Sequence, residues 1–233
     1  MKVILINPNS TLAAGSRRYR RFLTPLLPMG IAYIAAVLEK NGIETIIIDQ
    51  FANKISNREL AEKINVINPQ VVGISCLTST MNNVEDLCRQ IKVNRRWVVL
   101  GNIHPTIFAD ELLRRNIANI VVRGEGEFSM LEILLAINKN KSFKDIKGIS
   151  YSFNGRIYHN REGGLIEDLD KLPYPAWHLF NLKYYREAPL ISIYDLVLPI
   201  QASRGCPFRC TFCAQDRIYK KPRYRFTRYR CIV

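Results

Sequence analysis

The stretch Val71-Val72-Gly73-Ile74-Ser75-Cys76-Leu77-Thr78-Ser79-Thr80 decides the fold. Its first residues are apolar on both faces and rich in valine and isoleucine, which is typical of a buried parallel strand. The small hydroxyl residues that follow can hydrogen-bond a polar ligand, or they can cap the next helix. The stretch therefore predicts a buried strand whose carboxyl end faces either a ligand or a helix N-terminus.

The same pattern recurs along the first 140 residues. Four further strands are expected at Lys2–Asn7, Glu44–Asp49, Trp97–Gly101 and Asn119–Arg123. Helical patterns alternate with them at Gly30–Asn41, Ser56–Ile67, Asn82–Asn94, Ala109–Asn116 and Glu127–Asn138. Ser56 and Glu59 form a capping-box pattern at one helix start. Five such units predict an α/β fold with an open, doubly wound, five-stranded parallel sheet, Rossmann-like with the flavodoxin-like order 2-1-3-4-5.

The pattern changes after residue 138. Two short strands flank Asn154-Gly155, which predicts a β-hairpin with a type I′ turn. The proline-containing run from Leu172 to Trp177 is interpreted as a linker, and Leu196–Gln201 as another apolar strand. We expect an α/β domain over 1–145, a hairpin and linker over 146–194, and the start of a second domain over 195–233.

Composition narrows the class of protein. Apolar residues make up 48% and charged residues 23% of 233, which is ordinary for a globular chain and excludes a disordered or fibrous one. The longest apolar run, Met29–Leu38, is too short to span a membrane. The apolar stretch at the start of the chain is too short for a signal peptide. We expect a cytoplasmic protein without a membrane partner, in a reducing compartment.

The net charge of +14 is concentrated near the end of the sequence. Residues 201–233 hold nine basic residues and one acidic residue, and a second basic cluster covers Arg17–Arg21. Aromatic side chains at Tyr219, Tyr224, Phe226 and Tyr229 lie among the basic ones. This pattern leaves a nucleic-acid-binding protein as a minor alternative, because basic tails are as often merely solvated.

The loops after the third and fourth strands are candidate binding segments, since ligands of open α/β sheets bind at the carboxyl ends of strands. They contain Ser75 to Thr80 and Gly101 to Thr106, the latter with His104. Gly101 would let a ligand approach the backbone. The loops lack Gly-x-Gly-x-x-Gly, so a dinucleotide is not expected. A helix cap and a structural histidine are the alternatives, and Cys76 and Cys88 are interpreted as small core residues.

The segment Cys206-Pro207-Phe208-Arg209-Cys210-Thr211-Phe212-Cys213 is the strongest chemical signal. Three thiolates within eight residues can converge on one metal centre, and soft thiolates select zinc or an iron–sulfur cluster. Structural zinc takes four ligands, and Cys231 is the later candidate for a fourth. Three ligands suit a [4Fe–4S] cluster with one open iron, and a zinc knuckle closed by Cys231 is the alternative.

These motifs resemble a known family. The cysteine segment, with Ser203-Arg204-Gly205 before it and Phe212 before the last cysteine, resembles the signature of radical S-adenosylmethionine (SAM) enzymes. The upstream part resembles the cobalamin-binding domain that precedes the radical SAM domain in the B12-dependent branch. The residues that carry this second likeness are Ser75-x-Leu77, Gly101, Arg123-Gly124-Glu125-Gly126-Glu127, and the run from Asp168 through Leu172-Pro173 and Pro175-Ala176-Trp177.

The resemblance implies cofactors and roles. Cys206, Cys210 and Cys213 would hold the [4Fe–4S] cluster, and Phe212 with Cys213 would contact SAM. Cobalamin would be contacted by residues at the strand ends: Asn7, Ser75, Leu77, Thr78, Gly101, His104, Gly124 and Glu125. A B12-dependent methyltransferase is implied, with an unassigned small-molecule substrate and an electron donor such as flavodoxin or ferredoxin.

Two departures from the family qualify what it implies. The Asp-x-His-x-x-Gly motif that supplies a cobalt-ligating histidine elsewhere is absent, and the family's Gly-Gly pair is Gly101-Asn102. Only 20 residues follow Cys213, whereas each βα unit of a barrel takes about 30. We therefore expect the front part of a longer enzyme, inactive by itself. A non-catalytic cobalamin-binding module or gene fragment is the alternative.

Overall fold

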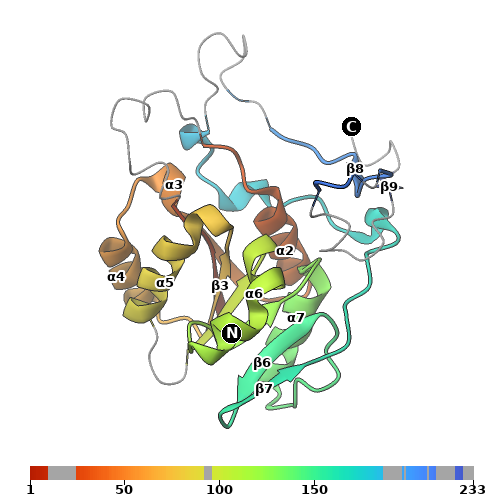
Figure 1. Cartoon of the computed structure of the whole chain (residues 1–233). Helices are drawn as coiled ribbons and strands as arrows, with labels where there is room; N and C mark the ends of the chain where they lie inside the picture. Colours follow the sequence, from red (N-terminus) through yellow and green to blue (C-terminus); the bar gives the residue numbers. More distant parts are fainter. Residues whose placement is uncertain are drawn as a thin grey trace.

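A computed structural model describes residues 1–9, 25–91, 96–185, 196, 198–208, 210–213 and 224–227. Its centre is a seven-stranded sheet of order β2-β1-β3-β4-β5-β6-β7, with helices on both faces (Figure 1). The first five strands are parallel and follow the predicted order 2-1-3-4-5. The fold class predicted from the sequence is therefore confirmed.

The strands of this sheet are β1 (Lys2–Asn7), β2 (Glu44–Asp49), β3 (Val71–Ser75), β4 (Trp97–Gly101), β5 (Ile120–Val122), β6 (Ile149–Phe153) and β7 (Arg156–His159). The helices are α2 (Met29–Lys40), α3 (Gln50–Asn53), α4 (Asn57–Ile67), α5 (Met81–Ile91), α6 (Ile103–Arg114) and α7 (Glu127–Asn138). Short 3-10 helices are η1 (Thr78–Thr80), η2 (Leu169–Lys171), η3 (Trp177–Leu179) and η4 (Leu182–Tyr184), and a separate ribbon pairs β8 (Ser203–Arg204) with β9 (Arg225–Phe226).

Two layers of apolar side chains attach the helices to the sheet. One face packs against α4, α5 and α6 through the fully buried Leu60, Leu87 and Leu112. The other face packs against α2 and α7 through Leu38 and Leu134. Burying one such side chain stabilises the fold by about 1.5–3 kcal/mol. The sheet is consequently apolar on both faces, as the sequence predicted.

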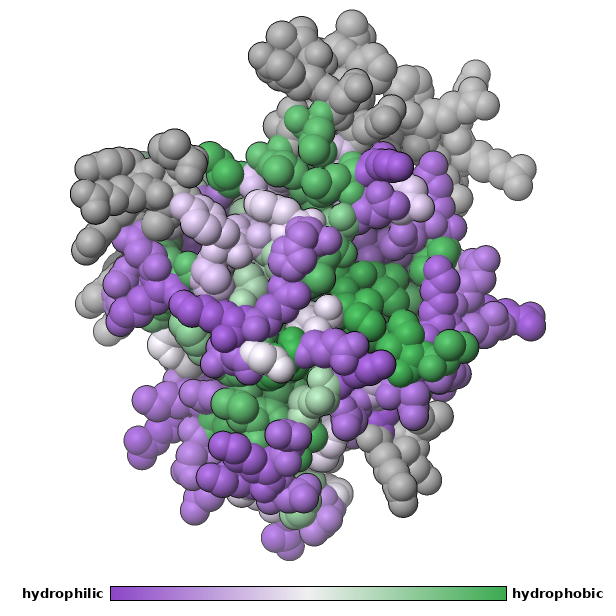
Figure 2. Space-filling view, turned by 180° about the vertical axis from the view of Figure 1, so that it is seen from behind, coloured by the Kyte–Doolittle hydropathy of each residue, from purple (hydrophilic) through white to green (hydrophobic). Residues whose placement is uncertain are grey.

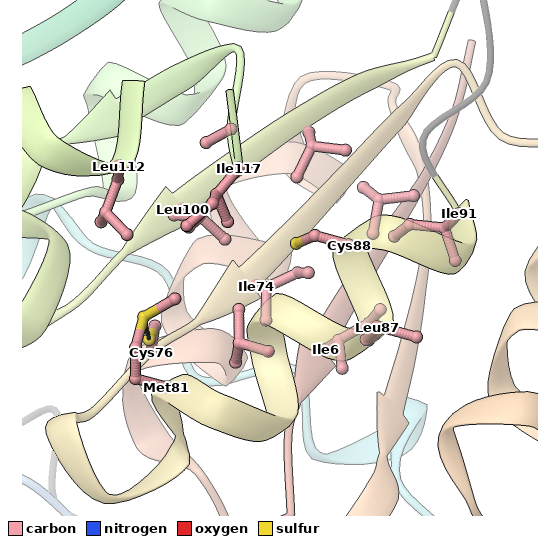
Figure 3. Close-up of a cluster of buried hydrophobic side chains, with 14 of the residues drawn as sticks. Ile6, Ile74, Cys76, Met81, Leu87, Cys88, Ile91, Leu100, Leu112 and Ile117 are labelled. Carbon is pink, nitrogen blue, oxygen red and sulfur yellow. Dashed lines mark hydrogen bonds between the residues drawn. The ribbon is translucent and has the colours of Figure 1, made fainter. Parts of the chain in front are cut away.

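The first of these layers contains both cysteines of the α/β part (Figure 3). Cys76 and Cys88 lie among the apolar side chains of α5, β3 and β4, with exposed fractions of 0% and 1%. Burial raises the pKa of the Cys76 thiol to about 11, so it is protonated at neutral pH. Their predicted role as core residues is confirmed.

The hairpin expected in the linker is part of the main sheet. Its strand β6 pairs antiparallel with β5, and β6 pairs with β7. The pairing satisfies backbone groups that β5 would otherwise expose at the sheet edge. Asn154 and Gly155 have φ angles of 49° and 75°, as a type I′ turn requires.

Two other local predictions were wrong. Helix α6 begins at Ile103, six residues earlier than expected, because Asn102 caps it and a proline is tolerated in a first helical turn. In the described part of the expected strand Leu196–Gln201, residue 196 forms only a single β-bridge and residues 198–201 form no strand. The strand before the cysteines is β8, and its antiparallel partner is β9. The basic cluster Arg17–Arg21 lies outside the described residues, as do Cys231, Tyr219 and Tyr229.

The segment after η2 packs back onto the sheet domain. Phe180 and Tyr185 are buried against Leu27 and Ala52. The Tyr185 hydroxyl donates a hydrogen bond of 2.8 Å to Asp49 Oδ2 at the end of β2. Burial, and then the charge of Asp49, raise the pKa of Tyr185 above its ordinary value. The neutral hydroxyl therefore holds this segment to β2.

Figure 2 shows the back of the molecule, where hydrophobic groups reach the surface in patches between hydrophilic ones. Large exposed apolar side chains include Leu77, Ile103 and Ile107 near the carboxyl ends of β3 and β4.

No helix in the described part of the chain is both long and apolar enough to cross a membrane.

Candidate functional site: a glycine-lined cavity at the strand ends

A cavity of about 590 Å³ opens at the carboxyl end of the sheet and continues between the sheet and helices α2 and α7. Its interior is formed by strand residues Leu5, Gly73, Val99 and Val122 and by helix residues Ile31, Ile34 and Met130. Its rim includes Asn7, Ser75, Leu77, Gly101, Gly124 and Glu125. Six of the eight residues predicted to contact a cofactor therefore line one cavity.

Glycines shape this cavity. Six glycines line it, at positions 30, 73, 101, 124, 126 and 205. A Cβ at Gly73 would lie 2.8 Å from Leu5 Cδ2 and 3.2 Å from Met130 Cε, so a side chain there would displace two lining residues. A Cβ at Gly101 would have its nearest neighbour 3.9 Å away, and one at Gly124 would have none within 4 Å. The rim backbone is thus open to a ligand.

Ser75 and Asn102 connect the ends of β3 and β4 at the rim. Asn102 has φ +84° and ψ −167°, a strained backbone conformation that is otherwise almost confined to glycine. Its Oδ1 accepts a hydrogen bond of 2.7 Å from the Ile103 amide, and its Nδ2 donates one of 2.9 Å to Ser75 Oγ. Asparagine therefore fulfils the conformational role of the second glycine and ties the two strand ends together.

Thr78 and His104 contact each other at 3.2 Å between Oγ1 and Nδ1. The His104 ring also packs on Phe108, with ring centroids 4.6 Å apart. Burial lowers the pKa of His104, and Glu111 opposes this only partly. Neither Thr78 nor His104 is among the described residues that line the cavity, so their contact with a cofactor stays a prediction.

One wall of the cavity is a buried cluster of four charges. Glu125, in the loop after β5, accepts two hydrogen bonds from Arg225, of 2.9 and 2.8 Å. Glu127, at the start of α7, pairs with Arg204 at 2.6 Å, and Arg204 also lies 3.5 Å from Glu125. The four side chains are only 5–11% exposed. We call these residues, Glu125, Glu127, Arg204 and Arg225, the ion cluster.

Two members of the ion cluster, Glu125 and Arg204, have pKa values shifted toward their charged forms. Burial alone would raise the pKa of Glu125, but hydrogen bonds from Arg225 and the Ile166 amide, with the charges of Arg225 and Arg204, lower it below its ordinary value. Burial would likewise lower the pKa of Arg204, but Glu127 and Glu125 raise it. The two carboxylates and two guanidinium groups therefore neutralise one another, which offsets their loss of hydration.

The cysteine loop follows the ion cluster directly. Cys206 is half-buried, whereas Cys210 and Cys213 are exposed, and the Cys213 amide donates to the Cys210 carbonyl across a turn. Phe212 is 91% exposed. Within the described residues, no three histidine, cysteine or acidic side chains are grouped to hold a metal ion. Cluster ligation by the three cysteines, and SAM contact by Phe212 and Cys213, stay predictions.

Sequence analysis missed two parts of this site. An isolated glycine within a buried strand indicates close approach of another group, so Gly73 could have pointed to the cavity interior. Glu127 was interpreted as a helix start, which is correct, but its ion pair was not foreseen. No local signal marks Arg225, whose partner Glu125 is 100 residues away.

Comparisons with known proteins agree with the motifs. The sequence model of the B12 binding domain matches residues 20–134. The chain is 32% identical over 227 residues to an uncharacterized methyltransferase of Pyrococcus horikoshii, which covers 95% of this chain and 47% of that protein. It is 31% identical over 206 residues to the anaerobic magnesium-protoporphyrin IX monomethyl ester cyclase of Rubrivivax gelatinosus, covering 85% of this chain and 36% of that one.

The fold has a close structural counterpart. A structure of the cobalamin-dependent S-adenosylmethionine radical enzyme OxsB, with aqua-cobalamin and SAM bound, matches 99% of this chain and 30% of that one with a TM-score of 0.78. At 19% identity this likeness shows the fold. Residues 20–134 therefore match a B12 binding domain, and the chain shares its fold with a cobalamin-dependent SAM radical enzyme. It spans about half the length, or less, of the two curated relatives.

Proposed function

We propose that this chain binds cobalamin, with one end of the cofactor in the glycine-lined cavity. The observation that carries the proposal is the cavity itself, which runs from the strand ends into the space between the sheet and α2 and α7. A volume of about 590 Å³ takes part of a large cofactor and leaves the rest above the rim. The B12 binding domain match, over residues 20–134, covers the lining strands β3, β4 and β5.

The lining residues suit this cofactor chemically. Cobalamin is a flat macrocycle with amide substituents and a nucleotide tail that ends in an apolar base. Leu5, Val99 and Met130 offer apolar contacts inside the cavity, whereas the Ser75 hydroxyl and the backbone at Gly101 offer polar ones at the rim. The apolar interior would exclude water from the buried end, and the glycine rim would let the macrocycle approach the backbone.

We further propose that Cys206, Cys210 and Cys213 hold a [4Fe–4S] cluster that binds SAM, and that the reaction is of the B12-dependent methyltransferase type. Bound cobalamin supplies a cobalt–carbon bond through which a methyl group can be transferred. Support comes from the cysteine motif and from a relative that is a methyltransferase. The curated relatives also include a cyclase, so the substrate is left open.

Cobalamin retention tests the first proposal. In Gly101→Leu, the new Cβ itself would meet no close neighbour, and the rest of the leucine side chain would project into the rim of the cavity. Gly164→Leu is the matched control, because Gly164 is exposed, is not a lining residue, and would place an added Cβ more than 4 Å from any neighbour. After incubation with hydroxocobalamin and gel filtration, we expect the control to retain the cofactor like the wild type.

We expect Gly101→Leu to retain roughly tenfold less cobalamin, since overpacking of a fitted site costs about 1–3 kcal/mol. Equal retention by both variants and the wild type would remove cobalamin from this cavity. No retention by the wild-type chain would contradict the proposed function as a whole.

A further inference from the structure

The ion cluster joins parts of the chain that are far apart in sequence. Glu125 and Glu127 belong to the sheet domain, at the end of β5 and the start of α7. Arg204 and Arg225 belong to β8 and β9, which form a separate ribbon beside the carboxyl end of the sheet (Figure 1). Cys206 follows Arg204 by two residues. The cluster is therefore a bridge between the cavity wall and the start of the cysteine loop.

The ion cluster is held together by short, charged hydrogen bonds. Arg225 binds Glu125 through two parallel hydrogen bonds and donates a third, of 2.7 Å, to the Ile166 carbonyl. The Ile166 amide donates a hydrogen bond of 2.6 Å to the same Glu125 carboxylate. Bidentate arginine–carboxylate pairs fix direction as well as distance. Glu125 is thus held from two sides, by β9 and by the segment around Ile166.

Arg204 is fixed in the same way on the other strand of the ribbon. Its guanidinium pairs with Glu127 and lies 5.1 Å from the centre of the Tyr33 ring on α2. It also donates a hydrogen bond of 2.8 Å to Gln201 Oε1. The ribbon itself has only two residues in each strand. So short a ribbon is not stable alone, and its position depends on what its side chains bind.

We propose that Glu125 and Glu127 are positioning residues for the cysteine loop. Through Arg225 and Arg204 they fix the ribbon against the cavity wall, so that the loop begins at a set place and direction beside the cavity mouth. The identity of the metal group on the loop rests on the proposed function, but the positioning of the loop does not. The charges are matched in pairs, so breaking one pair leaves its partner charge buried and unbalanced.

Hydrogen exchange of the 233-residue chain without cofactors tests this directly. The variants are Glu127→Gln, Arg204→Gln and the double variant with both changes. The double variant removes the charges together, which keeps the test valid if either single variant folds poorly. The matched control is the pair Arg58→Gln and Glu62→Gln, because this ion pair is exposed, at 87% and 63%, and lies on α4.

The reporters are amides of the ribbon, compared with amides of the sheet. The Thr227 amide donates 2.9 Å to the Ala202 carbonyl, so peptides covering 198–208 and 224–227 report on the ribbon. Amides of β3 report on the sheet. We expect both single variants to speed exchange in the ribbon by roughly tenfold or more, the effect of one unpaired buried charge. Exchange in β3 should equal that of the control.

A double-mutant cycle measures whether the two residues act through each other. If they do, the double variant speeds ribbon exchange less than the product of the two single effects. Ribbon exchange at the control level in both single variants would overturn the proposal. Equal acceleration in the ribbon and in β3 would also overturn it, since the ion cluster would then stabilise the whole fold and not the loop position.

A second measurement tests whether the ion cluster affects the iron–sulfur cluster that we propose for the cysteine loop. After anaerobic reconstitution with iron and sulfide, Glu127→Gln should lose its visible cluster absorbance to a chelator several-fold faster than the exposed control pair. If ribbon exchange is faster but the cluster absorbance is lost at the control rate, the position of the loop does not affect how firmly the iron–sulfur cluster is held. A wild-type chain that takes up no iron would contradict the proposed function and leave the exchange result standing.

Discussion

Gly73→Ala is the most direct perturbation of the cavity, because the structure shows what the new methyl group would strike. The added Cβ would lie 2.8 Å from Leu5 Cδ2 and 3.2 Å from Met130 Cε. Both distances are shorter than ordinary van der Waals contact. Since Leu5 and Met130 are buried and line the cavity, the space into which they can move is the cavity itself.

Two opposing effects set the size of the change. Replacing glycine by alanine reduces the entropy of the unfolded chain and stabilises the fold by about 0.4–1 kcal/mol. Forcing an extra carbon into a packed interior costs about 1–3 kcal/mol. The lower part of that range applies here, because the two struck atoms end flexible side chains that can turn into the cavity. We expect Gly73→Ala to lower the free energy of unfolding by about 0.5–1 kcal/mol.

Urea denaturation of the cofactor-free chain measures this change. The double variant Gly73→Ala with Leu5→Val provides a rescue, because valine has no Cδ atom to be struck. We expect the double variant to be more stable than the two single changes would give by addition. Gly73→Ala with wild-type stability, or a strictly additive double variant, would refute the close approach of Leu5 to Gly73 and with it this account of the cavity interior.

Three further predictions concern the loop, the packed segment and the ion cluster. Alanine at any cysteine of the 206–213 triplet should abolish iron and sulfide binding after anaerobic reconstitution, whereas Cys88→Ala should retain it; stoichiometric zinc that requires Cys231 would contradict this. Tyr185→Phe should lower the free energy of unfolding by about 1–3 kcal/mol, because Asp49 loses its buried hydroxyl donor, and an unchanged urea midpoint would argue against that hydrogen bond. The pKa of Glu125 is lowered from its ordinary 4.5, so its ion pairs stabilise the ribbon fully above pH 4.5 and are lost as pH falls through the lowered pKa. Ribbon exchange, corrected for its intrinsic pH dependence, should therefore be constant from neutral pH down to pH 4.5 and rise in more acidic solution. In Glu125→Gln this position cannot titrate, although Glu127 still pairs with Arg204, so the acidic rise should be smaller than in the wild type. An equal acidic rise in both chains would contradict this prediction.

Much of this protein is determined by local sequence. Apolar runs such as Val71–Ser75 can be stable only when both faces are covered, so they predict a buried parallel sheet. The capping box at Ser56 and Glu59 forms within a single helical turn, and Asn154-Gly155 specifies its own turn. The three cysteines of residues 206–213 are also a local motif. Each of these features depends on residues a few positions apart, and this is why the sequence alone reveals them.

Only the tertiary structure decided the features that depend on distant partners. The hairpin joins the main sheet because β5 offers β6 an open edge. The cavity reaches between sheet and helices because Gly73 leaves room beside Leu5 and Met130. Glu125 meets Arg225 across 100 residues. No local pattern encodes such a pair, because its stability comes from mutual burial and charge balance, which exist only once the chain has folded.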